Sequence, residues 1–176
     1  LIGFNVLVAL VTWLLVSEVQ RFDFYIFGSN NHEAVLEFGE YHRLLTSLFL
    51  HGSPLDIRLT MIHLFFNMYA LWIIGQWVES FFGHVRYLMV YFLGGFLGSL
   101  LSVALTQGNS VGASGAVFAV FGAQMVFLYK HRKLFGEMAR QQLRQLIIIG
   151  GINFAIGIAS SFGDGVQIDN WGHLGG

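Results

Sequence analysis

The chain has 176 residues, of which 55% are hydrophobic and only 11% are charged, against about 25% charged in a typical soluble domain. This composition excludes an ordinary soluble protein and indicates a single domain over residues 1–176 of a multi-pass protein embedded in the lipid bilayer. The net charge of −1 argues against nucleic acid as a partner. The chain has no cysteine, which excludes disulfides and thiolate metal sites.

Six apolar segments predict an all-α, polytopic membrane helix bundle of six transmembrane helices, and we expect the first and last of them to be truncated in this chain. The expected spans cover residues 3–17, 61–78, 85–106, 111–129, 146–160 and a sixth from 171 onward. Residues 18–60 are expected to form a long loop, with an interfacial segment near Arg43. Residues 130–144 are expected to be a charged linker and residues 161–170 a polar loop.

The placement of lysine and arginine predicts the orientation of the bundle, because cytoplasmic segments are enriched in these residues. Six of the nine basic residues fall on one side of the expected bundle: Arg86, Lys130, Arg132, Lys133, Arg140 and Arg144. We expect that side to be cytoplasmic. The 18–60 loop and the 161–170 loop then face the extracytoplasmic side.

Four polar side chains fall near the extracytoplasmic ends of three expected spans. They are His63 and Asn67 in the second span, Ser114 at the start of the fourth and His173 near the start of the sixth. His63 and Asn67 are four residues apart and share a helix face. Ser114 stands between two glycines, which let another backbone or a substrate approach its hydroxyl. Such polar residues in membrane helices are costly and indicate function.

The chemistry that fits these four side chains is acyl transfer. A serine hydroxyl becomes a nucleophile when a neutral imidazole takes its proton. The oxyanion that forms then needs donors such as an imidazole N–H, an amide NH2 or a backbone N–H. Taken singly, Ser114 could bond to its own helix, His173 could be an interfacial histidine, and the pair in the second span could link two helices. Their shared depth favours the catalytic interpretation.

Four motifs occur in order along the chain: Tyr41-His42-Arg43-Leu44, His63-x-x-x-Asn67, Gly112-Ala113-Ser114-Gly115 and His173-x-x-Gly176. Together they resemble the rhomboid family of intramembrane serine proteases. The resemblance implies a Ser–His dyad with Ser114 as nucleophile and His173 as general base. It also implies that His63, Asn67 and the Ser114 backbone N–H surround the oxyanion. It implies transmembrane proteins as substrates and no metal or cofactor.

The sequence departs from the family pattern at three positions: His42 stands for the usual Trp, Gly172 for Ala and Ile168 for Gly. The last two bear on how closely the fourth and sixth spans pack. Phe118 stands where an aromatic ring often stacks on the catalytic histidine, and we expect that contact. Asp169 lies four residues before His173. We expect it to cap the sixth helix and not to complete a catalytic triad.

The expected function is cleavage of peptide bonds in or near transmembrane segments of membrane proteins, through an acyl-enzyme intermediate. We expect the active site to open toward the extracytoplasmic side, in the plasma membrane of a prokaryote, with the 161–170 loop and the start of the fifth span as a mobile cap. Two alternatives stay open: an inactive rhomboid-like protein that binds membrane helices, and a small transporter that uses the same polar residues as a relay. A metalloprotease is disfavoured because no His-Glu-x-x-His motif occurs.

Overall fold

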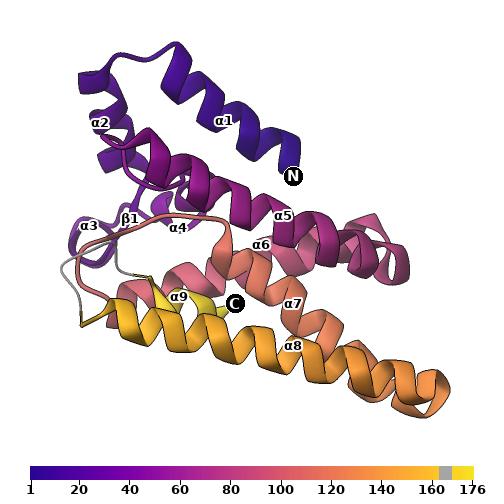
Figure 1. Cartoon of the computed structure of the whole chain (residues 1–176). Helices are drawn as coiled ribbons and strands as arrows, with labels where there is room; N and C mark the ends of the chain where they lie inside the picture. The colour runs from indigo at the N-terminus through magenta and orange to yellow at the C-terminus, as the bar shows by residue number, and fades with distance from the viewer. Residues whose placement is uncertain (163–167) are drawn as a thin grey trace.

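The computed structural model describes residues 1–162 and 168–176, which form a bundle of helices with one short strand pair (Figure 1). In chain order the elements are α1 (Ile2–Leu14), α2 (Glu18–Gly28), β1 (Asn30–Asn31), α3 (His32–Leu36), α4 (Arg43–Thr46), the 3-10 helix η1 (Ser47–Phe49), α5 (Ile57–Phe82), α6 (His84–Leu105), β2 (Asn109–Ser110), α7 (Ser114–Lys130), α8 (Arg132–Ser160) and α9 (Asn170–Gly175). The expected helical fold class is confirmed.

Three of these helices, α5, α6 and α8, are long and apolar enough to cross a membrane. Helices α1 and α7 are apolar but shorter, with 13 and 17 residues, and α9 has six. The outward surface of α5 carries exposed large side chains such as Ile62, Phe65 and Phe66. This surface suits contact with lipid tails, which are apolar like the side chains. The count of six spanning helices stays a prediction.

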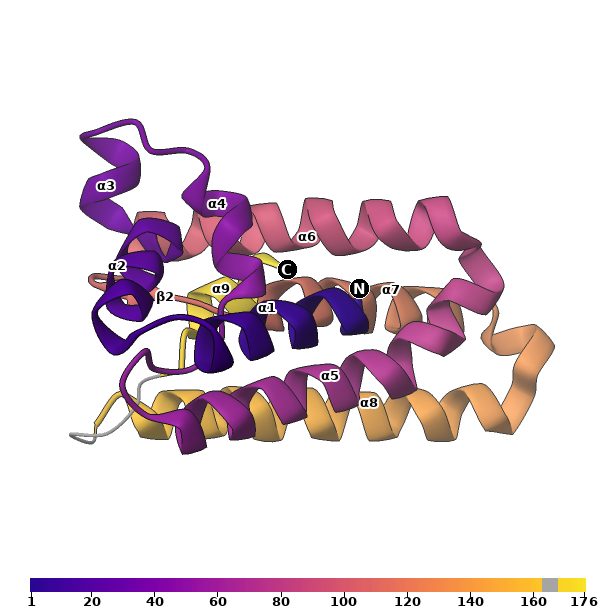
Figure 2. The ribbon, with the colours of Figure 1, turned by 90° about the horizontal axis from the view of Figure 1, so that it is seen from above.

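Helix α7 is the central helix of the bundle. It packs against α5, α6, α8 and α9, which lie around it in Figures 1 and 2. The contact with α6 is made by small residues: a Cβ added to Gly94 would lie only 2.0 Å from the Cβ of Ala119. Such close backbone approach is how helices associate in lipid, where burial of apolar surface gives little driving force.

Two connecting regions contain more helix than we expected. Residues 18–60 hold α2, α3, α4, η1 and the first turn of α5. Helix α2 is started by a capping box, in which the Ser17 side chain and the Gln20 side chain bond each other's backbone N–H. Helix α5 starts at Ile57, earlier than expected, because the Asp56 side chain accepts hydrogen bonds from the N–H groups of its first turn.

The expectation of a charged linker over residues 130–144 is wrong. Helix α7 continues to Lys130, and α8 starts at Arg132 and runs to Ser160, with one non-helical residue at Gly136. The physical reason is that arginine, glutamine and glutamate are good helix formers, so charge ends the membrane span without ending the helix. The central part of the expected 161–170 cap, residues 163–167, lies outside the described residues.

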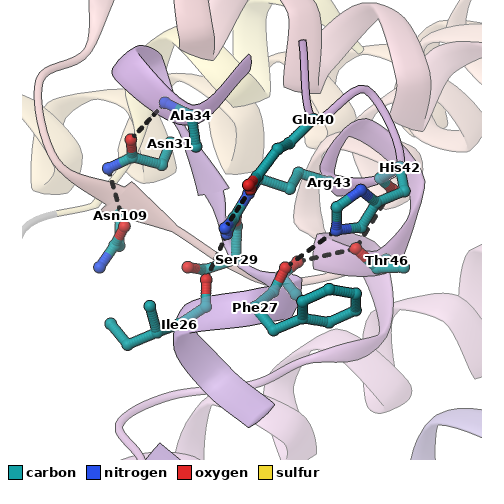
Figure 3. A network of polar contacts seen from close by, with 11 residues as sticks. Ile26, Phe27, Ser29, Asn31, Ala34, Glu40, His42, Arg43, Thr46 and Asn109 are labelled. Carbon is teal, nitrogen blue, oxygen red and sulfur yellow. Dashed lines mark hydrogen bonds and ion pairs between the residues drawn. The ribbon is translucent and has the colours of Figure 1, made fainter. Parts of the chain in front are cut away.

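A two-residue strand pair joins the first loop to the segment that precedes α7. Strands β1 and β2 are antiparallel, with Asn30 opposite Ser110 and Asn31 opposite Asn109. The Asn31 side chain donates to Asn109 Oδ1 at 2.9 Å (Figure 3), and the Asn30 side chain donates to the Ser99 carbonyl oxygen at 2.8 Å. These bonds anchor the first loop to α6 and to the segment that precedes Ser114.

Candidate active site

Ser114 is the first residue of α7, and a tight turn sets where that helix begins. Gly112 has φ +130°, a conformation that side chains other than glycine rarely adopt. Its N–H donates to the Ser47 carbonyl oxygen at 2.9 Å. The turn is therefore held by η1 of the first loop. Ser114 lines a small pocket together with Ser99, Ser102 and other polar residues, so its hydroxyl lies on a partly accessible surface.

His173 lies on α9 with its ring against α7. The imidazole stacks on Phe118, with 4.4 Å between ring centroids and 17° between ring planes, so the expected contact is confirmed. Phe118 is four residues after Ser114 and therefore shares its helix face. The stack thus keeps the imidazole of His173 beside the face of α7 that carries the serine.

The approach of α9 to α6 and α7 depends on glycine. A Cβ added to Gly98 of α6 would lie 2.6 Å from the Gly172 carbonyl oxygen, and one added to Gly115 of α7 would lie 3.0 Å from it. Any side chain at Gly98 would push α9 outward. Glycine at these positions lets the residue before His173 sit directly on the start of α7.

His63 lies on the other side of the Ser114 turn. Its Nδ1 accepts a hydrogen bond from the Gly52 N–H at 3.1 Å, so in the neutral imidazole Nε2 carries the proton. A Cβ added to Gly112 would lie 2.7 Å from both Nε2 and Cε1 of His63. The ring therefore packs against the glycine two residues before Ser114, with its N–H end at the turn.

Asn67 shares the face of α5 that carries His63, as the spacing predicted, and it is buried. Its amide donates to the His63 carbonyl oxygen at 3.0 Å, which leaves its second N–H available. Within residues 1–162 and 168–176, no hydrogen bond joins Ser114 to Asn67 or to His173. In ligand-free enzymes catalytic hydrogen bonds are often long and tighten only when substrate binds.

His51 was not among the candidate residues expected from sequence. Its ring lies 5.3 Å from the His63 ring, edge to face, and its side chain is buried. Burial, with a smaller contribution from the neighbouring His63, lowers the pKa of His51 to about 3. His51 is therefore neutral near pH 7 and supports the His63 ring by packing. No spacing rule could have found this contact, because an irregular turn separates the two residues in sequence.

Arg43 holds the first loop together through a network of polar contacts (Figure 3). Its guanidinium is buried, pairs with Glu40 at 2.5 Å and donates to the carbonyl oxygens of Ile26 and Ser29. A buried charge is tolerated when it is paired and fully hydrogen-bonded. The network holds α4, and through α4 the 3-10 helix that bonds Gly112.

His42 replaces the expected tryptophan and makes two contacts to Phe27. Its Nε2 donates to the Phe27 carbonyl oxygen at 3.1 Å, and its ring stacks on the Phe27 ring at 4.6 Å. An N–H donor on a flat ring, which is what tryptophan would bring, is therefore retained at this position.

Ser114 starts a helix and lies between two histidine side chains, within a bundle of apolar helices. These features define the class of the protein as an integral membrane protein with a polar site inside the helix bundle. The family model for the Rhomboid domain matches residues 38–176. The chain belongs to the rhomboid family.

Individual relatives show the same membership. The chain is 36% identical over 159 residues to Rhomboid protease GluP of Bacillus subtilis (strain 168), a match that covers 85% of this chain and 28% of GluP. It is 34% identical over 150 residues to RHOMBOID-like protein 6, mitochondrial, of Arabidopsis thaliana, covering 85% and 44%. It is 31% identical over 150 residues to Inactive RHOMBOID-like protein 8 of the same plant, covering 85% and 39%. The chain spans less than half the length of each of these relatives.

Proposed function

We propose that this protein is an intramembrane serine protease that cleaves peptide bonds in or near transmembrane segments of membrane proteins. The observation that carries the proposal is that two histidine rings lie on either side of Ser114. The His173 ring stacks on Phe118, and the His63 ring packs on Gly112. A nucleophile, a base and an oxyanion donor are the parts that acyl transfer needs.

In the proposed mechanism, the Ser114 hydroxyl oxygen attacks the carbonyl carbon of the scissile bond while His173 takes the hydroxyl proton. His173 then gives that proton to the leaving amine, and the C–N bond breaks to leave an acyl-enzyme. Water, deprotonated by His173, attacks the ester in the second half of the reaction. The product carboxyl group leaves and Ser114 regains its proton.

The proposed oxyanion site combines three donors. The Ser114 N–H belongs to the first turn of α7, where backbone N–H groups have no partner within the helix. The His63 Nε2–H is supported by the bond that Gly52 makes to Nδ1. The second N–H of the Asn67 amide completes the set. The positive end of the α7 dipole favours negative charge at the same place.

A dyad, without a carboxylate, is supported by the contacts of Asp169. Its side chain accepts hydrogen bonds from the Ser110 hydroxyl, the Thr106 hydroxyl and the Gly172 N–H. These contacts leave the carboxylate committed to groups other than the imidazole. His173 is then oriented by its stack on Phe118.

The proposed membrane setting follows from charge. The basic residues at the Lys130–Arg132 end of the bundle are expected to face the cytoplasm, so the Ser114 end faces the extracytoplasmic side. We place the protein in the plasma membrane of a prokaryote, with transmembrane proteins as substrates.

The relatives of this chain also include Inactive RHOMBOID-like protein 8, so family membership alone does not distinguish a protease from a binder. A fluorophosphonate probe does, since an activated serine displaces fluoride from its phosphorus. We expect mass spectrometry to find the probe on Ser114. Labelling should be lost in Ser114→Ala and His173→Ala and retained in Ser80→Ala, whose serine is exposed at the other end of α5. Folded wild-type protein that takes no label would favour the binder or the transporter.

A further inference from the structure

One carboxylate connects the segment before Ser114 to the helix that carries His173. Asp169 Oδ2 accepts a hydrogen bond from the Ser110 hydroxyl at 2.6 Å. Asp169 Oδ1 accepts two more, from the Thr106 hydroxyl at 3.1 Å and from the Gly172 N–H at 2.9 Å. Asp169 also lines the same pocket as Ser114. The bonds from Thr106 and Ser110 join parts of the chain that lie about 60 residues apart in sequence.

The three groups that donate to the Asp169 carboxylate lie close to Ser114 or His173 in the chain or at the end of a neighbouring helix. Thr106 directly follows the last residue of α6, and Ser110 belongs to β2, four residues before Ser114. The Gly172 N–H lies in the first turn of α9, directly before His173. The backbone of Asp169 adds a fourth bond, because its carbonyl oxygen accepts from the His173 N–H at 3.1 Å. The carboxylate therefore contacts the segment that precedes Ser114 and the helix that carries His173, but it contacts neither catalytic side chain of the proposed dyad.

Apart from the stack of His173 on Phe118, the contacts of α9 with α6 and α7 have little directionality. They are made largely by glycine backbones: the Gly172 carbonyl oxygen lies against Gly98 and Gly115. Smooth contacts of this kind permit close approach but resist sliding weakly, because no side chain interlocks. Hydrogen bonds to an ionised carboxylate are shorter and about twice as strong as neutral ones, and they have a preferred direction. Asp169 supplies the directional restraint that the glycines lack.

We propose that Asp169 is a positioning residue for the reaction of Ser114, and this proposal rests on the proposed function. By holding β2 and the start of α9 together, it sets the distance between the Ser114 hydroxyl and the His173 imidazole. A shift of about 1 Å in such a distance can cost about 10²-fold in rate. A helix cap alone would need only the Gly172 N–H. The two hydroxyl partners are what a cap does not require.

The test uses the full chain in detergent and measures the inactivation constant kinact and the binding constant KI for a fluorophosphonate probe. Asp169→Ala should lower kinact by about 10- to 100-fold and leave KI largely unchanged, because the Asp169 carboxylate is already bonded to Ser110, Thr106 and Gly172. Asp169→Asn should restore most of kinact, since the amide oxygen can still accept from the Gly172 N–H and the amide NH2 can donate to Ser110. A structural role alone would not separate kinact from KI in this way.

A second set of variants tests the link without touching the cap. Ser110→Ala with Thr106→Val removes both hydroxyl donors and leaves the Gly172 bond in place, so the fold is kept even if Asp169→Ala is unstable. We expect this pair to lower kinact, and adding it to Asp169→Ala should lower kinact no further, because all three changes break the same link. The control is Ser17→Ala, which removes the cap of α2, a helix remote from α9, and should leave kinact unchanged.

Several results would overturn the proposal. A wild-type kinact in Asp169→Ala would do so while leaving the proposed protease intact. A loss in Asp169→Asn as deep as in His173→Ala would make Asp169 a third catalytic residue and not a positioning one. Wild-type protein that takes no label at all would refute the proposed function, and the positioning role with it.

Discussion

The two ends of α7 are held in different ways. At the site end, around Ser114, the neighbours are glycines and single hydrogen bonds from the loops. At the aromatic end, around Phe127, the neighbours are rings: Trp77, Phe81, Phe82, His131 and Phe135 lie with centroids 4.3–6.1 Å from the Phe127 ring. Each aromatic pair adds about 0.5–1.5 kcal/mol beyond burial, so the aromatic end has redundant support.

The described residues around Ser114 form no comparable cluster of rings. Each contact there sets a different feature of the site. One holds the backbone conformation of Gly112, one lets Gly172 approach α6 and α7 closely, and one sets the tautomer of His63. We therefore expect single changes at the site end to reduce reactivity with modest effects on stability. Single changes at the aromatic end should reduce stability and leave reactivity almost unchanged.

The largest expected effect at the site end, after loss of the proposed dyad, comes from changing the proposed oxyanion donors. Removing one such donor costs about 2.7–4 kcal/mol in transition-state stabilisation, or about 10²–10³ in rate. His63→Ala and Asn67→Ala should each lower turnover of a membrane substrate by about this factor while its KM changes little. Turnover near wild type in both folded variants would remove His63 and Asn67 from the oxyanion site.

A smaller effect is expected from crowding the α6–α9 contact. In Gly98→Ala, the new Cβ would lie 2.6 Å from a backbone oxygen, so α9 must move and carry His173 with it. We expect a loss of about 1–3 kcal/mol in unfolding free energy and a fall of roughly tenfold or more in fluorophosphonate labelling rate.

Gly122→Ala is the matched control for Gly98→Ala. Gly122 lies in α7, and a Cβ there would meet no atom within 4 Å. The change should keep the labelling rate and can raise stability by up to about 1 kcal/mol, since alanine favours helix over glycine. Equal effects from the two alanines would show that α9 does not depend on the glycine contact.

At the aromatic end, Phe127→Leu should act on stability alone. The change removes several ring contacts, and we expect the unfolding free energy to fall by about 1–2 kcal/mol. The rate at which a fluorophosphonate labels Ser114 should stay within about twofold of wild type, because distant sites with no shared contacts act independently. A labelling rate that falls together with stability would remove the distinction between the two ends.

The two ends of α7 also illustrate which features the sequence can predict. Hydropathy located α5, α6 and α7 and put the four candidate residues near one end, because apolar length and helical spacing are local properties. Hydropathy predicted only the second half of α8, because Arg132 and Arg140 are compatible with a helix but not with the membrane interior. The short helices of the first loop depend on caps such as Asn31, whose effect on five residues no window average detects.

The finer parts of the site were less predictable. The stack of Phe118 on His173 was expected from the family resemblance, and the structure confirms it. The hydroxyl partners of Asp169 were not expected, because Thr106 and Ser110 are remote in sequence and ordinary in composition. The packing of His51 on His63 depends on an irregular turn, which follows no period.

The smallest expected effect is on activity when the two ends are marked with cysteine. The chain has no cysteine of its own, so Glu37→Cys and Glu137→Cys give a clean pair. Both positions are exposed, Glu37 at the site end in the first loop and Glu137 at the aromatic end near the start of α8. Neither side chain touches the site, so activity should be unchanged in both variants.

An impermeant thiol reagent added to intact cells should label position 37 and miss position 137, because the basic residues predict a cytoplasmic aromatic end. After the cells are opened, both positions should react, which controls for burial. The reverse pattern in intact cells would place Ser114 on the cytoplasmic side. The proposed protease would then take substrates from the other face of the membrane, while the contrast between the two ends of α7 would stand.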